Sequence, residues 1–143
     1  MISRRETLFA ALALLCEQAV AEAQDRTTNP QASSANASVF VHDLPNITMD
    51  DWQVTVSHVD YPPGRVGQMH HHAGFVLAYV LEGAVITKVS GQSERTYKTG
   101  EMFFEPPGST HEVSNNASQT EPAKLLAMIF AKKGDKLTLP GRA

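Results

Sequence analysis

Three consecutive histidines, His70, His71 and His72, stand just before the apolar run FVLAYVL. In an extended strand successive side chains point to opposite faces, so His70 and His72 share one face and His71 points away. Gln68 lies on the same face as this pair. Two imidazoles at this spacing could hold one divalent transition metal (Fe, Mn, Ni, Cu or Zn) if a more distant ligand completes the site. The alternative is a pair of solvated or core histidines.

The most suitable third ligand is His111, which follows a Pro-Gly corner in the stretch PPGSTH. Such a corner lets the adjoining strand bring its imidazole back toward the pair. The remaining histidines have weaker claims. His42 is expected at the surface. His58 shares an apolar face with Val54 and Val56, which favours a buried core histidine; a role beside the metal, or as a ligand, is the alternative.

Length and composition limit the class of protein to which this chain can belong. A chain of 143 residues, 42% hydrophobic and 19% charged, has the make-up of an ordinary globular protein with one modest core. The formal net charge of −3 gives no electrostatic reason to expect nucleic acid or an anionic membrane as a partner.

Residues 1–23 are expected to be a signal peptide. They have a basic start at Arg4 and Arg5, an apolar core and small-residue cleavage sites between positions 19 and 23. The apolar core, Leu8 to Cys16, is nine residues long, whereas a membrane span needs about 20, so no span is predicted. The stretch SRRETLF also resembles a twin-arginine export signal. The mature protein is therefore expected in the periplasm or outside the cell.

Residues 24–38 are small and polar, which is typical of a flexible leader. Cys16 is the only cysteine and lies in the expected signal peptide. The domain over residues 39–143 would then have no disulfide, thiolate ligand or cysteine nucleophile.

Short strands dominate that domain. Strand-like segments cover residues 52–60, 75–81, 84–98, 101–115 and 123–131. The segment 84–98 reads as a hairpin with Gly91 in its turn. Many short strands with regular turn signals predict an all-β sandwich or small barrel.

Two motifs in the correct order resemble those of the cupin superfamily. The first is a glycine, two histidines and a closing glycine, at Gly64, His70, His72 and Gly83. The second is complete, at Gly100, Pro106, Gly108, His111 and Asn115. The resemblance implies a single-domain antiparallel jelly-roll barrel that holds its site inside.

The first motif departs from the family at one position. The family's glutamate would fall on Val76, and Glu82 lies outside the pattern. The resemblance therefore implies a three-histidine variant without an anionic ligand, with Gln68 as a weak fourth contact. An ion held this way favours chelating oxygen donors. Glu105 and Tyr79 are possible acid–base groups, although Glu105 is equally typical of a solvated strand residue and Tyr79 of a wall residue.

Two functions remain open. The first is a metal-dependent oxidoreductase, dioxygenase-like, acting on a small chelating substrate, since redox iron or copper can work with three imidazoles and open positions. Three-histidine cupins include dioxygenases that act on thiols or diketones, in keeping with this resemblance. The alternative is a non-catalytic periplasmic module that binds a small ligand or metal. A homodimer is expected, because residues 75–81 are apolar on both faces and one barrel interior covers only one of them. The alternative is that the chain's own N-terminal or C-terminal strands cover the other face.

Overall fold

The computed structural model describes residues 38–143. The expected signal peptide, residues 1–23, and the leader up to residue 37 lie outside the described residues. Within the described part, no helix is long and apolar enough to span a membrane.

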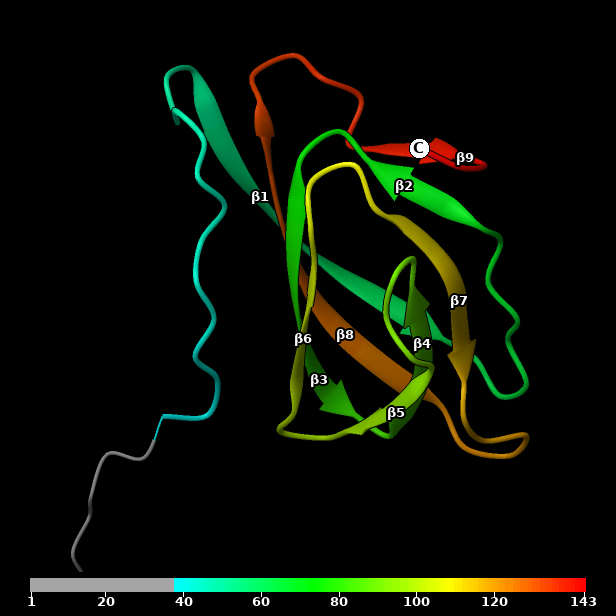
Figure 1. The fold of residues 1–143 in the computed structure, drawn as a ribbon. Helices are drawn as coiled ribbons and strands as arrows, with labels where there is room; N and C mark the ends of the chain where they lie inside the picture. The colour runs from blue at the N-terminus through cyan, green and yellow to red at the C-terminus, as the bar shows by residue number, and fades with distance from the viewer. Residues whose placement is uncertain (1–37) are drawn as a thin grey trace, which may run out of the picture. The chain divides into compact units, whose positions relative to one another are not determined.

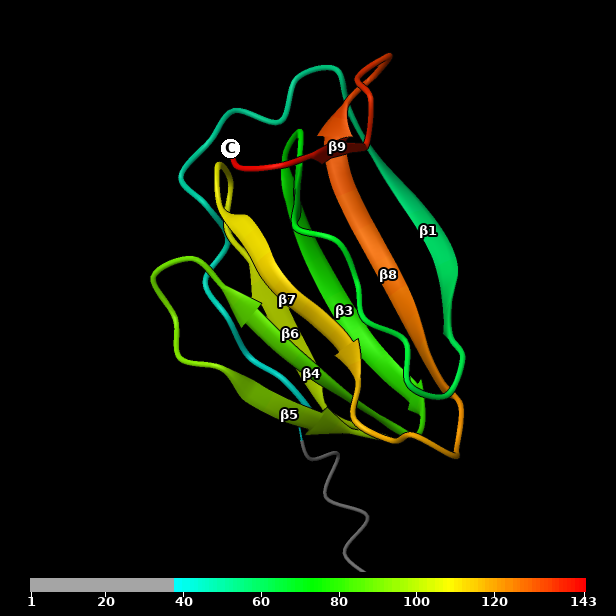
Figure 2. The ribbon, with the colours of Figure 1, turned by 90° about the vertical axis from the view of Figure 1, so that its right-hand side faces the viewer.

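The described residues form nine β-strands (Figure 1). These are β1 (Trp52–Tyr61), β2 (His70–His72), β3 (Phe75–Glu82), β4 (Ala84–Val89), β5 (Arg95–Lys98), β6 (Met102–Glu105), β7 (Thr110–Asn116), β8 (Ala123–Lys132) and β9 (Thr138–Pro140). They build two sheets, a four-stranded one in the order β1-β8-β3-β6 and a five-stranded one in the order β5-β4-β7-β2-β9. In Figure 2, β4, β5 and β7 lie in front of β3 and β6, and β8 and β1 continue the four-stranded sheet to the right. All strand pairs are antiparallel, which confirms the predicted all-β jelly-roll barrel.

Turn residues shape the connections as the sequence predicts. Gly91 lies in the turn between β4 and β5 with φ 79°, a left-handed conformation that glycine adopts without a Cβ clash. Gly108 has φ 71° in the Pro-Gly corner between β6 and β7. This corner reverses the chain so that His111, near the start of β7, lies beside β2.

Alternation along the strands decides which side chains enter the barrel. On β3, Val76 and Ala78 face the interior, and their partners on β6 are Glu105 and Phe103. A packed cluster fills part of the interior: Tyr61, Ala78, Val80, Val85, Phe103, Ala123 and Leu125. Full burial of a large apolar side chain contributes on the order of 1.5–3 kcal/mol to the stability of the fold, so this cluster holds the two sheets together. The rest of the interior is a cavity beside the cluster.

The outer face of the four-stranded sheet is also apolar. Val54 and Val56 on β1 are 49% and 54% exposed, and His58 lies on the same face. The prediction of a buried core His58 is therefore wrong, and so is a role at the site. The physical reason is that Val59 and Tyr61 point into the barrel, which turns the His58 side chain outward.

Candidate metal centre

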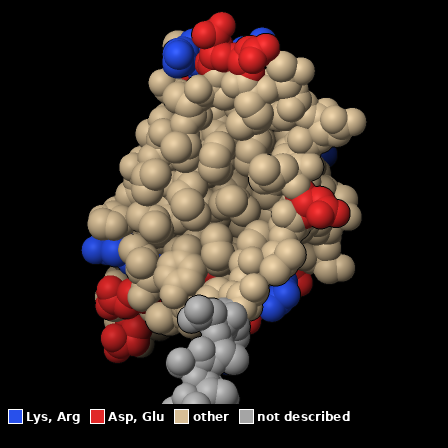
Figure 3. All heavy atoms as spheres, turned by 90° about the vertical axis from the view of Figure 1, so that its left-hand side faces the viewer, with Lys and Arg blue, Asp and Glu red and all other residues tan. Residues whose placement is uncertain are grey.

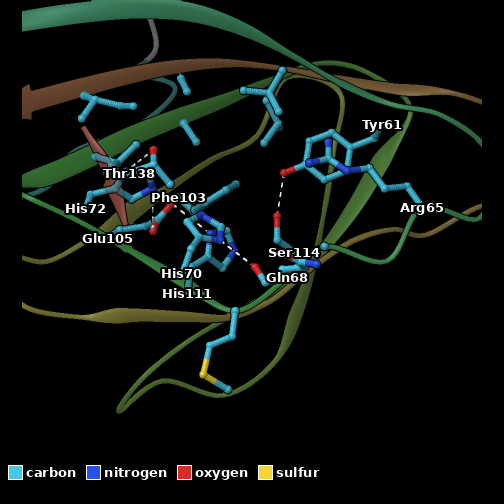
Figure 4. Close-up of a pocket in the computed structure, with 18 of the residues that line it drawn as sticks. Tyr61, Arg65, Gln68, His70, His72, Phe103, Glu105, His111, Ser114 and Thr138 are labelled. Carbon is cyan, nitrogen blue, oxygen red and sulfur yellow. Dashed lines mark hydrogen bonds and ion pairs between the residues drawn. The ribbon is translucent and has the colours of Figure 1, made fainter. Parts of the chain in front are cut away.

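Three short segments bring the candidate ligands together. The histidine triplet forms β2, which pairs with the start of β7 so that His70 and His111 are Cα partners. Their ring centroids are 5.0 Å apart, and those of His70 and His72 are 5.1 Å apart. The pair predicted from period-two spacing and the distant histidine thus meet in one place, shown in Figure 4.

A carboxylate completes this cluster. Glu105, the last residue of β6, is only 4% exposed. Its Oε1 lies 3.2 Å from His111 Nδ1, and its Oε2 lies 3.8 Å from His72 Nε2. One ligand atom from each of His70, Glu105 and His111 can be chosen so that all three lie within 4.8 Å of one another. The cluster therefore contains three imidazoles and one acid.

The expectation of a site without any carboxylate does not hold. Val76, at the position where the family has its glutamate, is buried and faces the interior, but it is directly paired with Glu105 on the neighbouring strand. The acid enters at the same level of the barrel from β6 instead of β3. Period-two alternation could have found it, since Phe103 and Glu105 share the inner face of β6.

Hydrogen bonds to backbone carbonyls orient two of the rings. Nδ1 of His70 donates to the Gln68 carbonyl at 2.8 Å, and Nδ1 of His72 donates to the Leu137 carbonyl at 2.9 Å. A carbonyl can only accept, so Nδ1 of each ring carries the hydrogen and Nε2 keeps the lone pair that a metal needs. These two histidines are therefore prepared as Nε2 ligands.

His111 presents its other nitrogen to the cluster. Its Nδ1 faces Glu105, while its Nε2 hydrogen-bonds the hydroxyl of Thr87, a buried residue of β4. A threonine hydroxyl can donate or accept. Nδ1–H can therefore donate to the Glu105 carboxylate, and with an ion in place Nε2–H can donate to Thr87 instead. Thr87 was not among the site residues predicted from the sequence, although Val85, Thr87 and Val89 alternate inward along β4.

The electrostatics of the cluster favour an ionised Glu105 carboxylate and a neutral His70 ring. Burial raises the pKa of the Glu105 carboxyl, but the hydrogen bond from His111 and the nearby imidazoles outweigh this and leave the pKa below its ordinary value. Burial also lowers the pKa of His70, and the neighbouring His111 adds to the effect. Ionised carboxylate and neutral imidazole are the forms that coordinate metals.

The other residues singled out from the sequence lie around or away from this cluster. Gln68 lines the cavity, and its backbone carbonyl holds His70. His71 is turned aside, with Nδ1 3.2 Å from the Gly141 carbonyl. Tyr79 is half-buried on the outer side of β3. His42 is exposed, and its ring centroid lies 4.2 Å from that of Phe104.

The cluster opens into a cavity of about 610 Å³. Its walls include apolar side chains from β3 and β8 of the four-stranded sheet, among them Val76, Leu125 and Ile129. Tyr61, Arg65 and Ser114 add polar groups. Cavities of this size are typical of small-molecule sites, in which a few polar groups fix the orientation of a ligand inside an apolar shell.

Residues 57–129 match the model of the cupin domain, which is about half of the chain. The chain therefore belongs to the cupin domain family. A comparison with curated proteins finds no match.

Solved structures with the same fold include three enzymes. DMSP lyase DddQ from Ruegeria pomeroyi has a TM-score of 0.53 at 18% identity, over 61% of this chain and 42% of that one. An oxalate oxidase has a TM-score of 0.51 at 19% identity, over 77% of this chain and 67% of the oxidase chain. Bacillus subtilis oxalate decarboxylase, a protein with Mn(II) centres, has a TM-score of 0.50 at 22% identity, over 61% and 23%. At these identities the likeness shows the fold alone, and this chain spans less than half of DddQ.

The donor set and spacing of the cluster fit one transition metal. Donors that each lie about 2.1 Å from one ion are roughly 3.0–3.5 Å apart at octahedral or tetrahedral angles. The distance of 3.2 Å between His111 Nδ1 and Glu105 Oε1 is in that range. The distance of 3.8 Å between His72 Nε2 and Glu105 Oε2 is slightly longer. Imidazole suits Zn, Cu, Fe and Ni, while carboxylate suits Mn. The cluster is therefore a candidate site for a divalent transition metal.

Proposed function

We propose that this cupin is a metal-dependent oxidoreductase, dioxygenase-like, that acts on a small chelating substrate. The observation that carries the proposal is the buried Glu105 carboxylate among His70, His72 and His111 beside a roomy cavity. When bound, a redox metal polarises a chelating substrate and exchanges electrons with it. An oxalate oxidase among the structures of this fold agrees with the proposal, although at 19% identity it does not carry it.

The residues of the chain have distinct parts in this proposal. His70 and His72 would hold the ion through Nε2, and His111 and Glu105 would hold it through the atoms that now face each other. Glu105 would also offset part of the charge of the ion. The apolar wall formed by Val76 and Ile129 would exclude bulk water from the reacting groups.

Metal analysis of protein purified without a histidine tag, followed by oxygen-uptake measurements, tests the proposal. We expect about one equivalent of transition metal, and oxygen consumption with one or more members of a panel of thiols, diketones and 2-oxo acids. Protein that binds no metal under any loading condition would contradict the whole proposal. Metal-loaded protein that binds members of this panel but consumes no oxygen would favour the alternative, a non-catalytic binding module.

We also propose that the protein is exported, because residues 1–23 have the composition of a signal peptide. Intact mass of the protein from the native host is the test. A mature chain that begins near residue 22 or 24 would support export. A chain that still carries Met1 in the cytosolic fraction would contradict it.

We propose a homodimer through the outer face of the four-stranded sheet. Figure 3 shows the side of the molecule on which this sheet lies behind the segment that precedes β1, with Lys, Arg, Asp and Glu at the edges of the view. The exposed Val54 and Val56 lie on the outer face of β1. A two-fold axis would place this face against its copy. Light scattering should give a dimer that Val56→Lys converts to a monomer; a wild-type monomer at micromolar concentration would contradict the proposal.

A further inference from the structure

The cavity has polar groups on two sides. Figure 4 shows His72 and Glu105 on one side of it and Arg65, Tyr61 and Ser114 on the other. Phe103 lies between the two groups in this view. The ligand cluster accounts for the first side only. The second group therefore calls for a separate explanation.

Arg65 is held in place without a carboxylate partner. Its Cζ atom lies 4.2 Å from the centroid of the Tyr61 ring, and its Nη1 donates to the backbone carbonyl of Asp60 at 2.6 Å. The Asp60 carboxylate pairs with Lys124 instead, and no acid of residues 38–143 lies within ion-pair distance of Arg65. A guanidinium has five N–H donors, so most of those of Arg65 are free for an anion.

Neighbouring hydroxyls extend this group into the cavity. The hydroxyl of the buried Tyr61 is 2.7 Å from Ser114 Oγ, and both residues line the cavity together with Arg65. The Tyr61 ring stacks against the guanidinium and fixes its position. Less side-chain conformational entropy is therefore lost when the guanidinium binds a ligand. The three side chains form a prepared site for one anionic oxygen group.

We propose that the cavity binds an acid with two anionic ends. A 2-oxo or 2-hydroxy carboxylate at one end would meet the metal centre, and a second carboxylate would meet Arg65. The short aliphatic chain between them would lie against Phe103 and Leu125, which line the wall. This inference rests on the proposed function for its first end and deepens it by naming the substrate class.

Charge and volume both favour this ligand over a simpler one. The positive charge of a divalent ion and Arg65 together is larger than the negative charge of Glu105, the one carboxylate that lines the cavity. A dianion therefore neutralises the site better than a monoanion. The volume of about 610 Å³ accommodates a chain of several carbons. A monoanion bound at the ion would leave the Arg65 donors to water.

Matched acids bound to cobalt-loaded protein test the proposal. The probes are 2-oxosuccinate, 2-oxoglutarate and 2-oxoadipate, each compared with the 2-oxo monocarboxylate of the same chain length. Calorimetry gives the affinity, and the visible absorption of Co(II) reports whether the 2-oxo end reaches the ion. We expect at least one diacid to bind roughly 10- to 100-fold more tightly than its monoacid, the gain of a charge-assisted hydrogen-bonded pair.

Substitution of Arg65 should remove this preference. Arg65→Gln should bring the diacid to the affinity of its monoacid and leave the monoacid unchanged, while Arg65→Lys should keep part of the preference. Arg95→Gln is the matched control, because Arg95 also stacks on a tyrosine, Tyr97 at 4.5 Å, but does not line the cavity. Unchanged melting temperature and Co(II) absorption of the unliganded variants confirm that they are folded.

The two proposals fail in different ways. Protein without Co(II) absorption would contradict the metal centre itself. Protein that binds monoacids at the ion, but shows no preference for any diacid, would overturn the Arg65 site and leave the metal centre standing. A diacid preference that survives in Arg65→Gln would likewise assign the second carboxylate to other residues.

Discussion

Val76 and Glu105 face each other across the β3–β6 pair, and both side chains are buried against the same cavity. The acid that the first motif lacks on β3 is therefore present on the next strand at the same level of the barrel. A cross-strand partner lies about 4.5–5.5 Å away between Cβ atoms, a distance that a longer side chain spans easily. This relationship makes the position of the acid exchangeable.

The first prediction exchanges the acid between strands. Glu105→Gln should weaken metal binding by at least about 10-fold to 100-fold, because it removes the anionic donor. Adding Val76→Glu to Glu105→Gln should restore much of the affinity, most clearly for Mn, which prefers carboxylate oxygen. Titration with Mn, followed by melting temperature and calorimetry, measures the effect. Val76→Glu alone places two carboxylates at the cluster and should lower the stability of the metal-free protein through their repulsion. No recovery in the double variant would show that Val76 does not reach the ion.

The second prediction concerns the histidines. Alanine at His70, His72 or His111 should lower metal affinity by about 100-fold or more, since each removes a ligand. His71→Ala should retain full stoichiometry, because Nδ1 of His71 faces the Gly141 carbonyl and its ring does not line the cavity. Metal content after dialysis is the measurement. A His111→Ala protein that keeps one equivalent would contradict the proposed ligand set.

The third prediction concerns the C-terminal segment. β9 pairs with β2, and the Leu137 carbonyl holds the hydrogen on Nδ1 of His72. Removal of residues 137–143 should therefore lower metal affinity by about 10-fold to 100-fold, as expected for the loss of a group that orients a ligand. Removal of residues 142–143 alone leaves β9 intact and serves as the control. Equal affinities for both truncations would show that β9 does not orient the site.

The fourth prediction concerns Tyr61 and pH. Burial raises the pKa of the Tyr61 phenol above its ordinary value of 10.0 and outweighs the hydrogen bond to Ser114, which lowers it. The folded state therefore favours the neutral phenol. The contribution of Tyr61 to the free energy of unfolding is fully present below about pH 10 and is lost as the pH rises through the folded-state pKa. Between pH 8 and pH 11, denaturant unfolding of metal-free protein should show that the free energy of unfolding falls more steeply in wild type than in Tyr61→Phe. Tyr61→Phe should cost about 1 kcal/mol at neutral pH through the lost hydrogen bond. Parallel pH curves would contradict the raised pKa.

The local pattern of the chain was sufficient for most of the fold. Alternation predicted the long strands, glycine predicted the β4–β5 turn, and the two motifs predicted the jelly roll. These features depend on neighbours in the sequence, so a single chain reveals them. The shared face of His70 and His72 followed from the same period of two.

Other features required the pairing of distant strands. The sequence alone could not decide whether Glu105 was solvated, because that depends on which strand lies opposite, and only the β3–β6 register placed it against Val76. His58 has an apolar face around it, but that face turned out to be the outer one. Alternation identifies two faces of a strand and does not say which one is covered.

The sequence by itself predicted a cupin, through two motifs, with a histidine pair on one face of a strand and a third histidine as the candidate ligand. Only the tertiary structure decided that a carboxylate joins them, that Thr87 and the Leu137 carbonyl orient the rings, and that Arg65 faces the same cavity. The physical reason is range. Strand period and turn chemistry act over a few residues, whereas a buried charge takes its surroundings from every strand packed around it.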